Sequence, residues 1–151
     1  MKRIIILIIL VIIITACSSF NSKEIENSIN IKSLNLNNKY SISSVKDNVE
    51  GIVLFIEFGK PDLENSNTVI GAHSGFGSNA YFNFLSNLKE KSEILLYYNG
   101  LKYKYFVEKV MIVDKSEIDI LNNKDYSTLT LISCNIYNLD ERIIVISRLE
   151  G

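Results

Sequence analysis

Apolar and polar residues alternate along much of the chain beyond residue 30, and this period of two predicts β-strands. Segments 31–36 and 40–45 show the alternation, which indicates strands with one buried and one exposed face. Segments 51–58 and 68–72 are short apolar runs bounded by Gly, Asn or Pro, as expected of buried strands. The pattern therefore predicts a chain built mainly from β-structure.

The clearest local prediction is a hairpin centred on Asn99 and Gly100. The β-rich run 94–98 precedes this pair, and the run 101–113 follows it. Asn and Gly both tolerate positive φ, which a type I′ turn requires at its two central positions. The two runs are therefore expected to pair as antiparallel neighbours.

Helical periodicity is scarce. Phe82, Leu85 and Leu88 recur every third residue within segment 79–88, which predicts a short helix or an amphipathic turn. Segment 115–123 is expected to hold one further helical turn. Helix therefore contributes little to the predicted fold.

Two β-rich segments near the C-terminus, 127–133 and 142–149, bring the number of predicted strands to about eight. Many short strands with little helix predict a mainly antiparallel barrel or sandwich. A chain of 151 residues is long enough for one domain with its own core but too short for two.

The N-terminus has the layout of an export signal. A basic start is followed by an unbroken apolar run of 11 residues at 4–14, and the sequence Ile-Thr-Ala then leads into Cys17. The run is shorter than the roughly 20 residues that a membrane-spanning helix needs. The segment 14–17 resembles a bacterial lipobox, in which Cys17 would carry a lipid and become the mature N-terminus.

Residues 17–30 are rich in Ser, Asn, Lys and Glu, which predicts a flexible tether. We therefore expect a lipoprotein-type signal peptide at 1–16, the tether at 17–30 and one folded domain at 31–151. The alternatives for the leader are a plain signal peptide cut nearby and a short uncleaved anchor. Each of them places the domain outside the cytoplasm, and the lipidated or uncleaved forms tether it to the membrane.

Charge and composition argue against several classes of function. The chain has 16 basic and 17 acidic residues, and it lacks a basic stripe, so a nucleic-acid partner is not predicted. One histidine, one unmodified cysteine and no clustered carboxylates fall short of a metal-ligand set. There is no glycine-rich phosphate loop, and no cofactor is predicted.

The chain has so few histidines and cysteines that the candidates for acid–base and nucleophilic chemistry are almost fixed. His73 is the single histidine, and Cys134 is the one thiol left if Cys17 is lipidated. Both follow β-rich runs, and a free thiol in an exported protein is more often chemical than structural. The alternatives are a histidine that only caps a loop and a cysteine that serves as a small buried hydrophobe.

A nearby cation would favour the thiolate form of Cys134. Arg142 and Arg148 lie on one predicted strand, six residues apart, which is about 20 Å at strand rise. Antiparallel pairing with segment 127–133 would bring Arg142 beside Cys134 and leave Arg148 at the far end. Arg142 could also stabilise an oxyanion by charge-assisted hydrogen bonds; the alternative is a solvated charge at a strand end.

These residues lie in segments that resemble the sortases, cysteine transpeptidases that attach proteins to the cell wall of Gram-positive bacteria. Segment 130–134, Thr-Leu-Ile-Ser-Cys, resembles the family signature Thr-Leu-x-Thr-Cys. Segment 67–74 is similar to the family's histidine segment, segment 82–88 to the apolar turn that follows it, and the start of segment 142–149 to the arginine-led last strand. The resemblance covers roughly residues 31–149.

The resemblance implies an eight-stranded β-barrel with one or two short helices and a two-step acyl transfer. Cys134 would attack a peptide carbonyl in a Leu-Pro-x-Thr-Gly-like sorting signal, and an amine would then release the acyl-enzyme thioester. His73 would serve as general acid and base, and Arg142 would hold the substrate and steady the oxyanion. Thr130, Ser133 and Ser74 are expected to bind substrate.

The implied partners are the sorting-signal peptide of a surface protein, an amine from a peptidoglycan precursor or a pilin lysine, and the membrane. Departures from the family pattern are Ser133 in place of Thr and Ala72 before the histidine, with Gly71 one place earlier. A lipobox is also unusual in a family generally anchored by a transmembrane helix. Segment 115–128 has no room for the long helix of one sortase class, so no class is assigned.

Two other functions fit the same pattern. A non-catalytic lipoprotein could keep the barrel to bind peptides, and a hydrolytic thiol peptidase could use the same site with water as acceptor. The catalytic hypotheses require the thiol of Cys134 and the ring of His73 to face one groove, with Arg142 on its other side.

Overall fold

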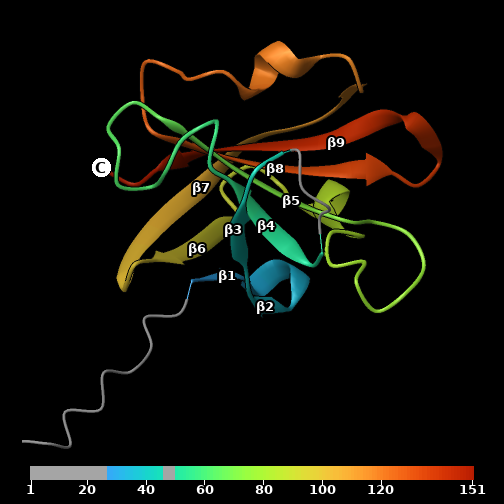
Figure 1. Ribbon diagram of the computed structural model, residues 1–151, viewed down its shortest axis with the longest axis horizontal. Coiled ribbons are helices and arrows are strands. Elements are labelled where there is room, and N and C mark those ends of the chain that lie inside the picture. The colour runs from blue at the N-terminus through green and yellow to red at the C-terminus, as the bar shows by residue number, and fades with distance from the viewer. Residues whose placement is uncertain (1–26, 46–49) are drawn as a thin grey trace, which may run out of the picture.

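The computed structural model describes residues 27–45 and 50–151. The expected signal peptide, Cys17 and residues 18–26 of the expected tether lie outside these residues. Nine strands within the described ranges form one sheet that curls into a nearly closed barrel (Figure 1). The prediction of a mainly β barrel is confirmed, with nine strands rather than eight. The sheet order is β2-β1-β6-β7-β9-β8-β5-β4-β3.

The strand bounds follow the predicted segments closely in most of the chain. They are β1 (Ser28–Ile31), β2 (Leu36–Lys39), β3 (Ser41–Ser43), β4 (Ile52–Phe55), β5 (Asn67–Ala72), β6 (Glu93–Tyr98), β7 (Leu101–Asp114), β8 (Thr128–Asn135) and β9 (Asn138–Leu149). The turn between β6 and β7 is confirmed: Asn99 and Gly100 both have positive φ, at 48° and 78°.

The N-terminal segment differs from the prediction. Segment 31–36 was expected to be one strand, but the 3-10 turn η2 (Lys32–Leu34) interrupts it and connects β1 to β2. Asn35 ends the turn in the left-handed region, at φ 52°, so that β2 folds back on β1. The first strand begins at Ser28, three residues before the expected start of the folded domain.

Helix is limited to short 3-10 turns in the described part of the chain, as the fold class implied. In the segment 79–88 only η3 (Leu85–Asn87) is helical. Phe82, Leu85 and Leu88 are all buried, and their spacing of three is that of a 3-10 turn. The second predicted turn is η4 (Ile118–Leu121), in the connection from β7 to β8.

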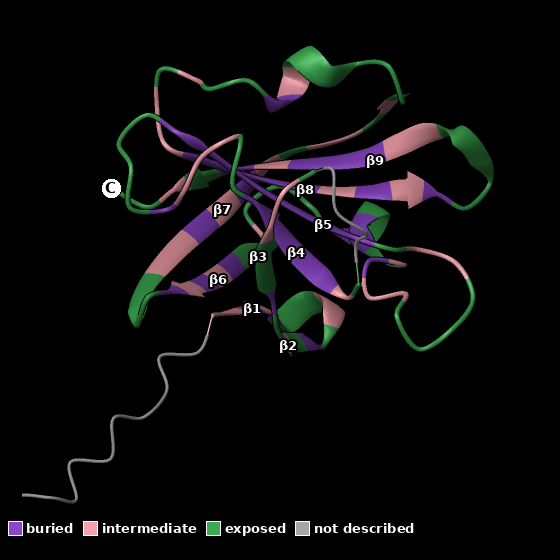
Figure 2. Ribbon diagram, viewed as in Figure 1, coloured by how far each residue is buried: buried purple, intermediate pink, exposed green. Residues whose placement is uncertain are grey.

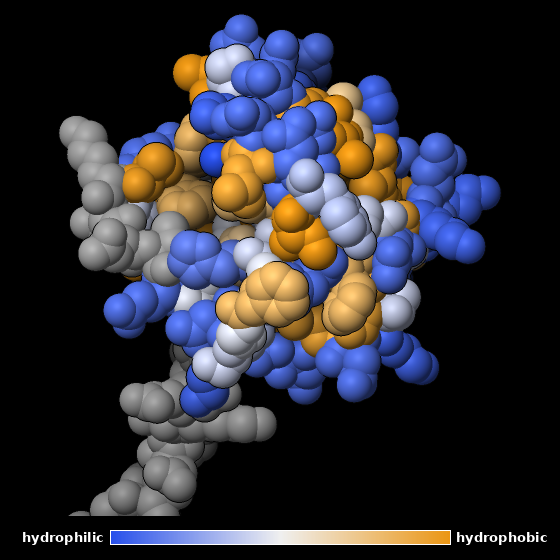
Figure 3. All heavy atoms as spheres, turned by 90° about the vertical axis from the view of Figure 1, so that its right-hand side faces the viewer, coloured by the Kyte–Doolittle hydropathy of each residue, from blue (hydrophilic) through white to orange (hydrophobic). Residues whose placement is uncertain are grey.

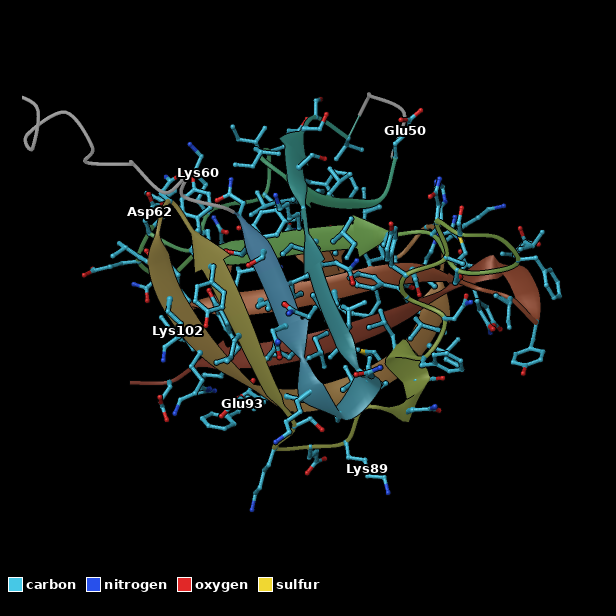
Figure 4. The ribbon with its side chains drawn as sticks, turned by 90° about the horizontal axis from the view of Figure 1, so that it is seen from below. Glu50, Lys60, Asp62, Lys89, Glu93 and Lys102 are labelled. Atoms are coloured by element: carbon cyan, nitrogen blue, oxygen red, sulfur yellow. The ribbon has the colours of Figure 1, made fainter. Side chains whose placement is uncertain are left out.

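The main core fills the barrel, and a second apolar cluster lies outside it. Every residue of β4 and β5 is buried, so these strands are covered on both faces (Figure 2). Their outward side chains Val53, Phe55 and Val69 pack with Leu121 of η4. Charged side chains such as Lys89, Glu93 and Lys102 lie at the periphery of the barrel (Figure 4).

Two strand pairings are parallel: β3 with β4 at one end of the sheet, and β5 with β8 further in. β5 pairs in parallel with β8, from Asn67 opposite Thr128 to Gly71 opposite Ile132. Parallel strands end at the same edge of a sheet, so the residues that follow β5 lie beside the end of β8. His73, which follows β5, and Cys134, near the end of β8, are therefore brought to one edge of the sheet.

Candidate active site

His73 and Cys134 meet at the edge where β5 and β8 end. Gly71 lies opposite Ile132, and His73 and Cys134 each come two residues later along parallel strands. Cys134 is half-buried and His73 is exposed. The thiol is thus held by a strand, while the imidazole belongs to the first residue of a loop.

Arg142 reaches the same place from the neighbouring strand. It is the direct partner of Cys134 in the antiparallel pairing of β8 with β9, and directly opposed side chains lie on the same face of a sheet. The guanidinium Nη1 donates to the carbonyl oxygens of Leu139, at 3.0 Å, and Glu141, at 2.8 Å. These two bonds to residues of β9 itself orient the guanidinium.

Arg148 lies far from this group. It is opposite Thr128, at the start of β8. Its Nε is 2.5 Å from a carboxylate oxygen of Glu108, and its guanidinium stacks over the ring of Tyr126 at 3.7 Å. Only Arg142 of the two arginines therefore adjoins Cys134.

The three candidate residues line one cavity of about 320 Å³, here called the first cavity. The rest of its lining is almost entirely apolar and comes from β4, β5, β8, η4 and the connection after β3. The lining is Val45, Phe55, Phe58, Val69, Gly71, Ala72, His73, Ile118, Leu121, Ile132, Ser133, Cys134 and Arg142. A thiol, an imidazole and a guanidinium thus share an apolar pocket, which is a set of groups able to carry out nucleophilic acyl transfer.

The floor of the first cavity depends on a glycine. A Cβ atom on Gly71 would lie 2.6 Å from Cε2 of Phe55, which is closer than van der Waals contact allows. Because Gly71 has no side chain, the ring of Phe55 from β4 can lie against the backbone of β5 at this position. Neither residue was recognised from the sequence as part of the site, because contacts across paired strands leave no local pattern.

The loop after His73 is tied to both sides of the site. The backbone oxygen of His73 accepts a hydrogen bond from the amide of Phe82, at 3.1 Å. The hydroxyl of Ser74 donates to the backbone oxygen of Cys134. Ser74, predicted to bind substrate, thus connects the histidine loop to the cysteine strand.

The other two residues predicted to bind substrate lie at different depths. Ser133 is buried but lines the first cavity. Thr130 is buried and does not line that cavity, and its hydroxyl donates to Oδ1 of Asn67 at 2.8 Å. The structure therefore places Thr130 in an internal polar cluster rather than at the cavity surface.

Asn67 is the centre of that polar cluster and was not recognised from the sequence. Its side chain is fully buried, and Oδ1 also accepts from the hydroxyl of Thr128 at 3.0 Å. Its Nδ2 donates to the backbone oxygen of Leu121, at 2.9 Å, and its own amide donates to Oδ1 of Asn123. A polar residue at the start of an apolar strand was the available signal. Asn67 fastens the η4 wall of the first cavity to β5 and β8.

The described ranges contain no group of three or more His, Cys, Asp or Glu side chains that could hold a metal ion. Between residues 27 and 45 and from 50 onward, no helix is long and apolar enough to cross a membrane.

Comparison with curated proteins found no match. Among solved structures, sortase C-1 from Actinomyces oris superposes with a TM-score of 0.76 and 20% identity, over 91% of this chain and 81% of that one. A lid mutant of sortase A from Corynebacterium diphtheriae superposes with a TM-score of 0.75 and 21% identity, over 89% of this chain and 74% of that one. Sortase C from Clostridium perfringens, solved with the C-terminal cell wall sorting motif, superposes with a TM-score of 0.73 and 23% identity, over 88% of this chain and 74% of that one. These similarities show a shared fold.

The family itself is shown by the sequence. The model of the sortase domain matches residues 24–150, which is most of the chain and includes His73, Cys134 and Arg142. The chain therefore belongs to the sortase family of cysteine transpeptidases.

Proposed function

We propose that the protein cleaves a Leu-Pro-x-Thr-Gly-like sorting signal at the C-terminus of a surface protein and transfers that protein to an amine. The observation that carries this proposal is the lining of the first cavity, which holds Cys134, His73 and Arg142 together within apolar walls. The other candidate functions predicted from the sequence are distinguished from it by the products of the reaction.

In the first step the thiolate of Cys134 attacks the carbonyl carbon of the scissile peptide bond, and a C–S bond forms. The carbonyl oxygen becomes an oxyanion, which the guanidinium of Arg142 stabilises by charge-assisted hydrogen bonds. The C–N bond then breaks, and the imidazolium of His73 donates its proton to the leaving amine. A thioester on Cys134 and neutral His73 remain.

In the second step a neutral amine attacks the thioester carbonyl and forms a new amide bond. His73 accepts the proton that the attacking nitrogen loses, and the C–S bond breaks to return the thiolate of Cys134. The charge state of the starting enzyme is thereby restored. Water in place of the amine would give hydrolysis by the same sequence of steps.

The apolar walls of the first cavity suit the Leu and Pro of such a signal. Phe55 and Val69 form part of its floor, and Ile118 and Leu121 come from η4. Apolar contacts of this kind hold a substrate, while a few polar groups orient its reacting bond. The sortase C from Clostridium perfringens that was solved with a cell wall sorting motif supports this choice of substrate class.

The test is to incubate the domain from residue 24 onward with a panel of sorting peptides, with and without an amine, and to identify the products by mass. We expect an adduct on Cys134 without amine and an amide product when amine is added. Cys134→Ala should give neither. A carboxylate product alone would indicate a hydrolytic peptidase, and binding without an adduct would indicate a non-catalytic module; either result would contradict the proposal.

We also propose that Cys17 carries a lipid that holds the domain at the outer face of the cell membrane. The Ile-Thr-Ala sequence before Cys17 supports this, and sortases act outside the cytoplasm as a family. Labelling of cells with a fatty acid should mark the full-length protein but not Cys17→Ser. Equal labelling of both would contradict the lipid anchor.

A further inference from the structure

The exposed carboxylate of Glu57 joins two connections that line the first cavity. Glu57 lies in the connection from β4 to β5, and its Oε1 accepts a hydrogen bond from the backbone amide of Val45 at 3.0 Å. The same oxygen accepts a second bond from the hydroxyl of Ser44. Val45 and Ser44 lie 12 and 13 residues earlier in the chain, in the connection after β3. One side chain therefore fastens two segments that are separate in the sequence.

These bonds continue the parallel pairing of β3 with β4 past the end of both strands. Ser43 is the partner of Phe55, and the amide of Ile56 donates to the carbonyl oxygen of Ser43 at 3.1 Å. The bonds that follow along this pair come from the side chain of Glu57. An ionised acceptor makes stronger hydrogen bonds than a neutral one. The carboxylate therefore sets the course of the backbone after Ser43.

The residues that adjoin these bonds form one wall of the first cavity. Val45 and Phe58 both line it, and Phe58 packs against the outer apolar cluster that includes Phe55 and Leu121. Val45, by contrast, is 50% exposed. Because burial stabilises a side chain roughly in proportion to the apolar area removed from water, packing alone holds Val45 weakly. The wall at Val45 therefore depends on the bonds to Glu57.

The reacting side chains are held by other parts of the fold. Cys134 lies on β8 and Arg142 on β9, and His73 begins the loop after β5. Figure 3 views the molecule from the edge of the sheet at which β5 and β8 end, and apolar groups lie at the surface there among polar ones. Val45 shares a cavity lining with Cys134 but belongs to a different element. A change at Glu57 should therefore alter the shape of the cavity and leave the thiol in place.

Building on the proposed function, we infer that Glu57 is a positioning residue for the sorting signal. Its carboxylate holds Val45 at the wall of the first cavity, and the leucine side chain of the signal packs against that wall. Glu57 itself touches neither the scissile bond nor the thiol. It acts on the binding of the peptide through Val45, and the rate of the chemical step does not depend on it.

The first experiment compares peptide kinetics of Glu57→Ala and Glu57→Gln in the full-length protein. Glu57 is exposed, so both variants should fold. In Glu57→Ala we expect the KM for a Leu-Pro-x-Thr-Gly peptide to rise roughly tenfold, with little change in the acylation rate at saturation. In Glu57→Gln the amide oxygen still accepts both bonds without the charge, so the rise should be only about two- to threefold. Glu64→Ala is the matched control, since Glu64 is an exposed carboxylate of the same connection and does not line the first cavity.

A second experiment locates the contact on the peptide. Replacing the leucine of the signal by alanine should raise the KM strongly in the unaltered protein and much less in Glu57→Ala, because the wall that the leucine contacts has already moved. Such non-additive effects are expected of groups that act on one contact. Replacing the residue at the x position should change the KM by the same factor in both proteins.

A third measurement separates positioning from a general structural role. The rate at which iodoacetamide alkylates Cys134 and the free energy of unfolding in urea should be the same in Glu57→Ala and in the unaltered protein. A peptide KM that rises while both of these stay constant assigns the effect to the binding of the signal.

Four outcomes would overturn the inference. An unchanged peptide KM in Glu57→Ala would mean that Val45 keeps its place without the carboxylate or lies outside the peptide site. An equal leucine-to-alanine factor in the two proteins would place the leucine elsewhere. Slower alkylation or weaker folding in step with the kinetic loss would make Glu57 a structural residue of the whole domain. No adduct on Cys134 in the unaltered protein would contradict the proposed function itself, and the inference with it.

Discussion

Arg142 lies directly opposite Cys134 in the antiparallel pairing of β8 with β9, and both side chains line the first cavity. The spacing of thiol and guanidinium is thus set by backbone hydrogen bonding between two strands. The carbonyl oxygens of Leu139 and Glu141, both in β9, orient the arginine from its own strand.

We expect Arg142→Lys to lower kcat/KM for thioester formation by about 100-fold or more, a magnitude typical of removing an oxyanion donor. A lysine keeps the charge but loses the planar fork that bonds directionally. Single-turnover acylation followed by mass measures the effect. Arg148→Lys is the matched control at the other end of β9 and should acylate normally; an equal loss there would contradict the role of Arg142.

Gly71→Ala should weaken binding of the sorting peptide. The added methyl group overlaps the ring of Phe55, which lines the first cavity and must shift to make room. We expect the peptide KM to rise several-fold, with a smaller change in the acylation rate at saturation. Kinetics over a range of peptide concentrations would show this split. The double variant with Phe55→Leu should recover much of the lost affinity, and a failure to recover would show that the ring is not the cause.

Asn67→Ala should destabilise the domain by about 2–4 kcal/mol, because it leaves buried hydrogen-bonding groups of Thr128, Thr130 and Leu121 without their partner. The free energy of unfolding in urea measures this. Thr128→Val keeps the shape of the side chain but removes its hydroxyl, so it should lower the free energy of unfolding by only about 1 kcal/mol. Equal losses in the two variants would argue against Asn67 as the centre of the cluster.

Stability should decrease at alkaline pH through buried tyrosine. Burial raises the pKa of Tyr105 from 10.0 to about 12, and burial also raises the pKa of Tyr40. Below pH 10 both tyrosines are protonated in the folded and unfolded states, so this contribution is fully present. Between pH 10 and 12 the unfolded chain ionises Tyr105 first, and the free energy of unfolding should fall.

Urea unfolding at pH 9, 10 and 11 would test this. Tyr105→Phe should flatten the decline, whereas Tyr137→Phe, at a position 92% exposed, should leave it unchanged. If the free energy of unfolding fell equally with pH in Tyr105→Phe and in the unaltered protein, Tyr105 would not be the cause of the decline.

Much of the fold could be predicted because strand patterns and turns are local. Alternation located most of the strands, and the positive φ that Asn99 and Gly100 tolerate located the turn between β6 and β7. The same reasoning failed at segment 31–36, where the 3-10 turn η2 lies between two strands. Ile31 and Leu36 face each other across the reversal between β1 and β2 and both lie in the core, so apolar residues of two strands were taken for those of one.

The candidate site could be predicted in part because the chain has so few histidines and cysteines. A single histidine and a single remaining thiol pointed to His73 and Cys134, and antiparallel pairing pointed to Arg142 rather than Arg148. Asn67 and Phe55 were beyond this reasoning, because the role of each depends on which segments pack against each other. Thr130 was expected at the surface of the site, but its hydroxyl turns inward to Asn67.

The sequence by itself determined the strand-rich character of the domain, its β6–β7 turn and the small set of side chains able to carry the chemistry. Only the tertiary structure decided that β5 pairs in parallel with β8, that the η4 segment covers one side of this pair, and that Cys134, His73 and Arg142 line one cavity. The physical reason is that alternation and turn preference act between neighbours along the chain. Strand partners are chosen instead by burial shared among residues far apart in sequence, and that choice places His73 and Arg142 on either side of one thiol.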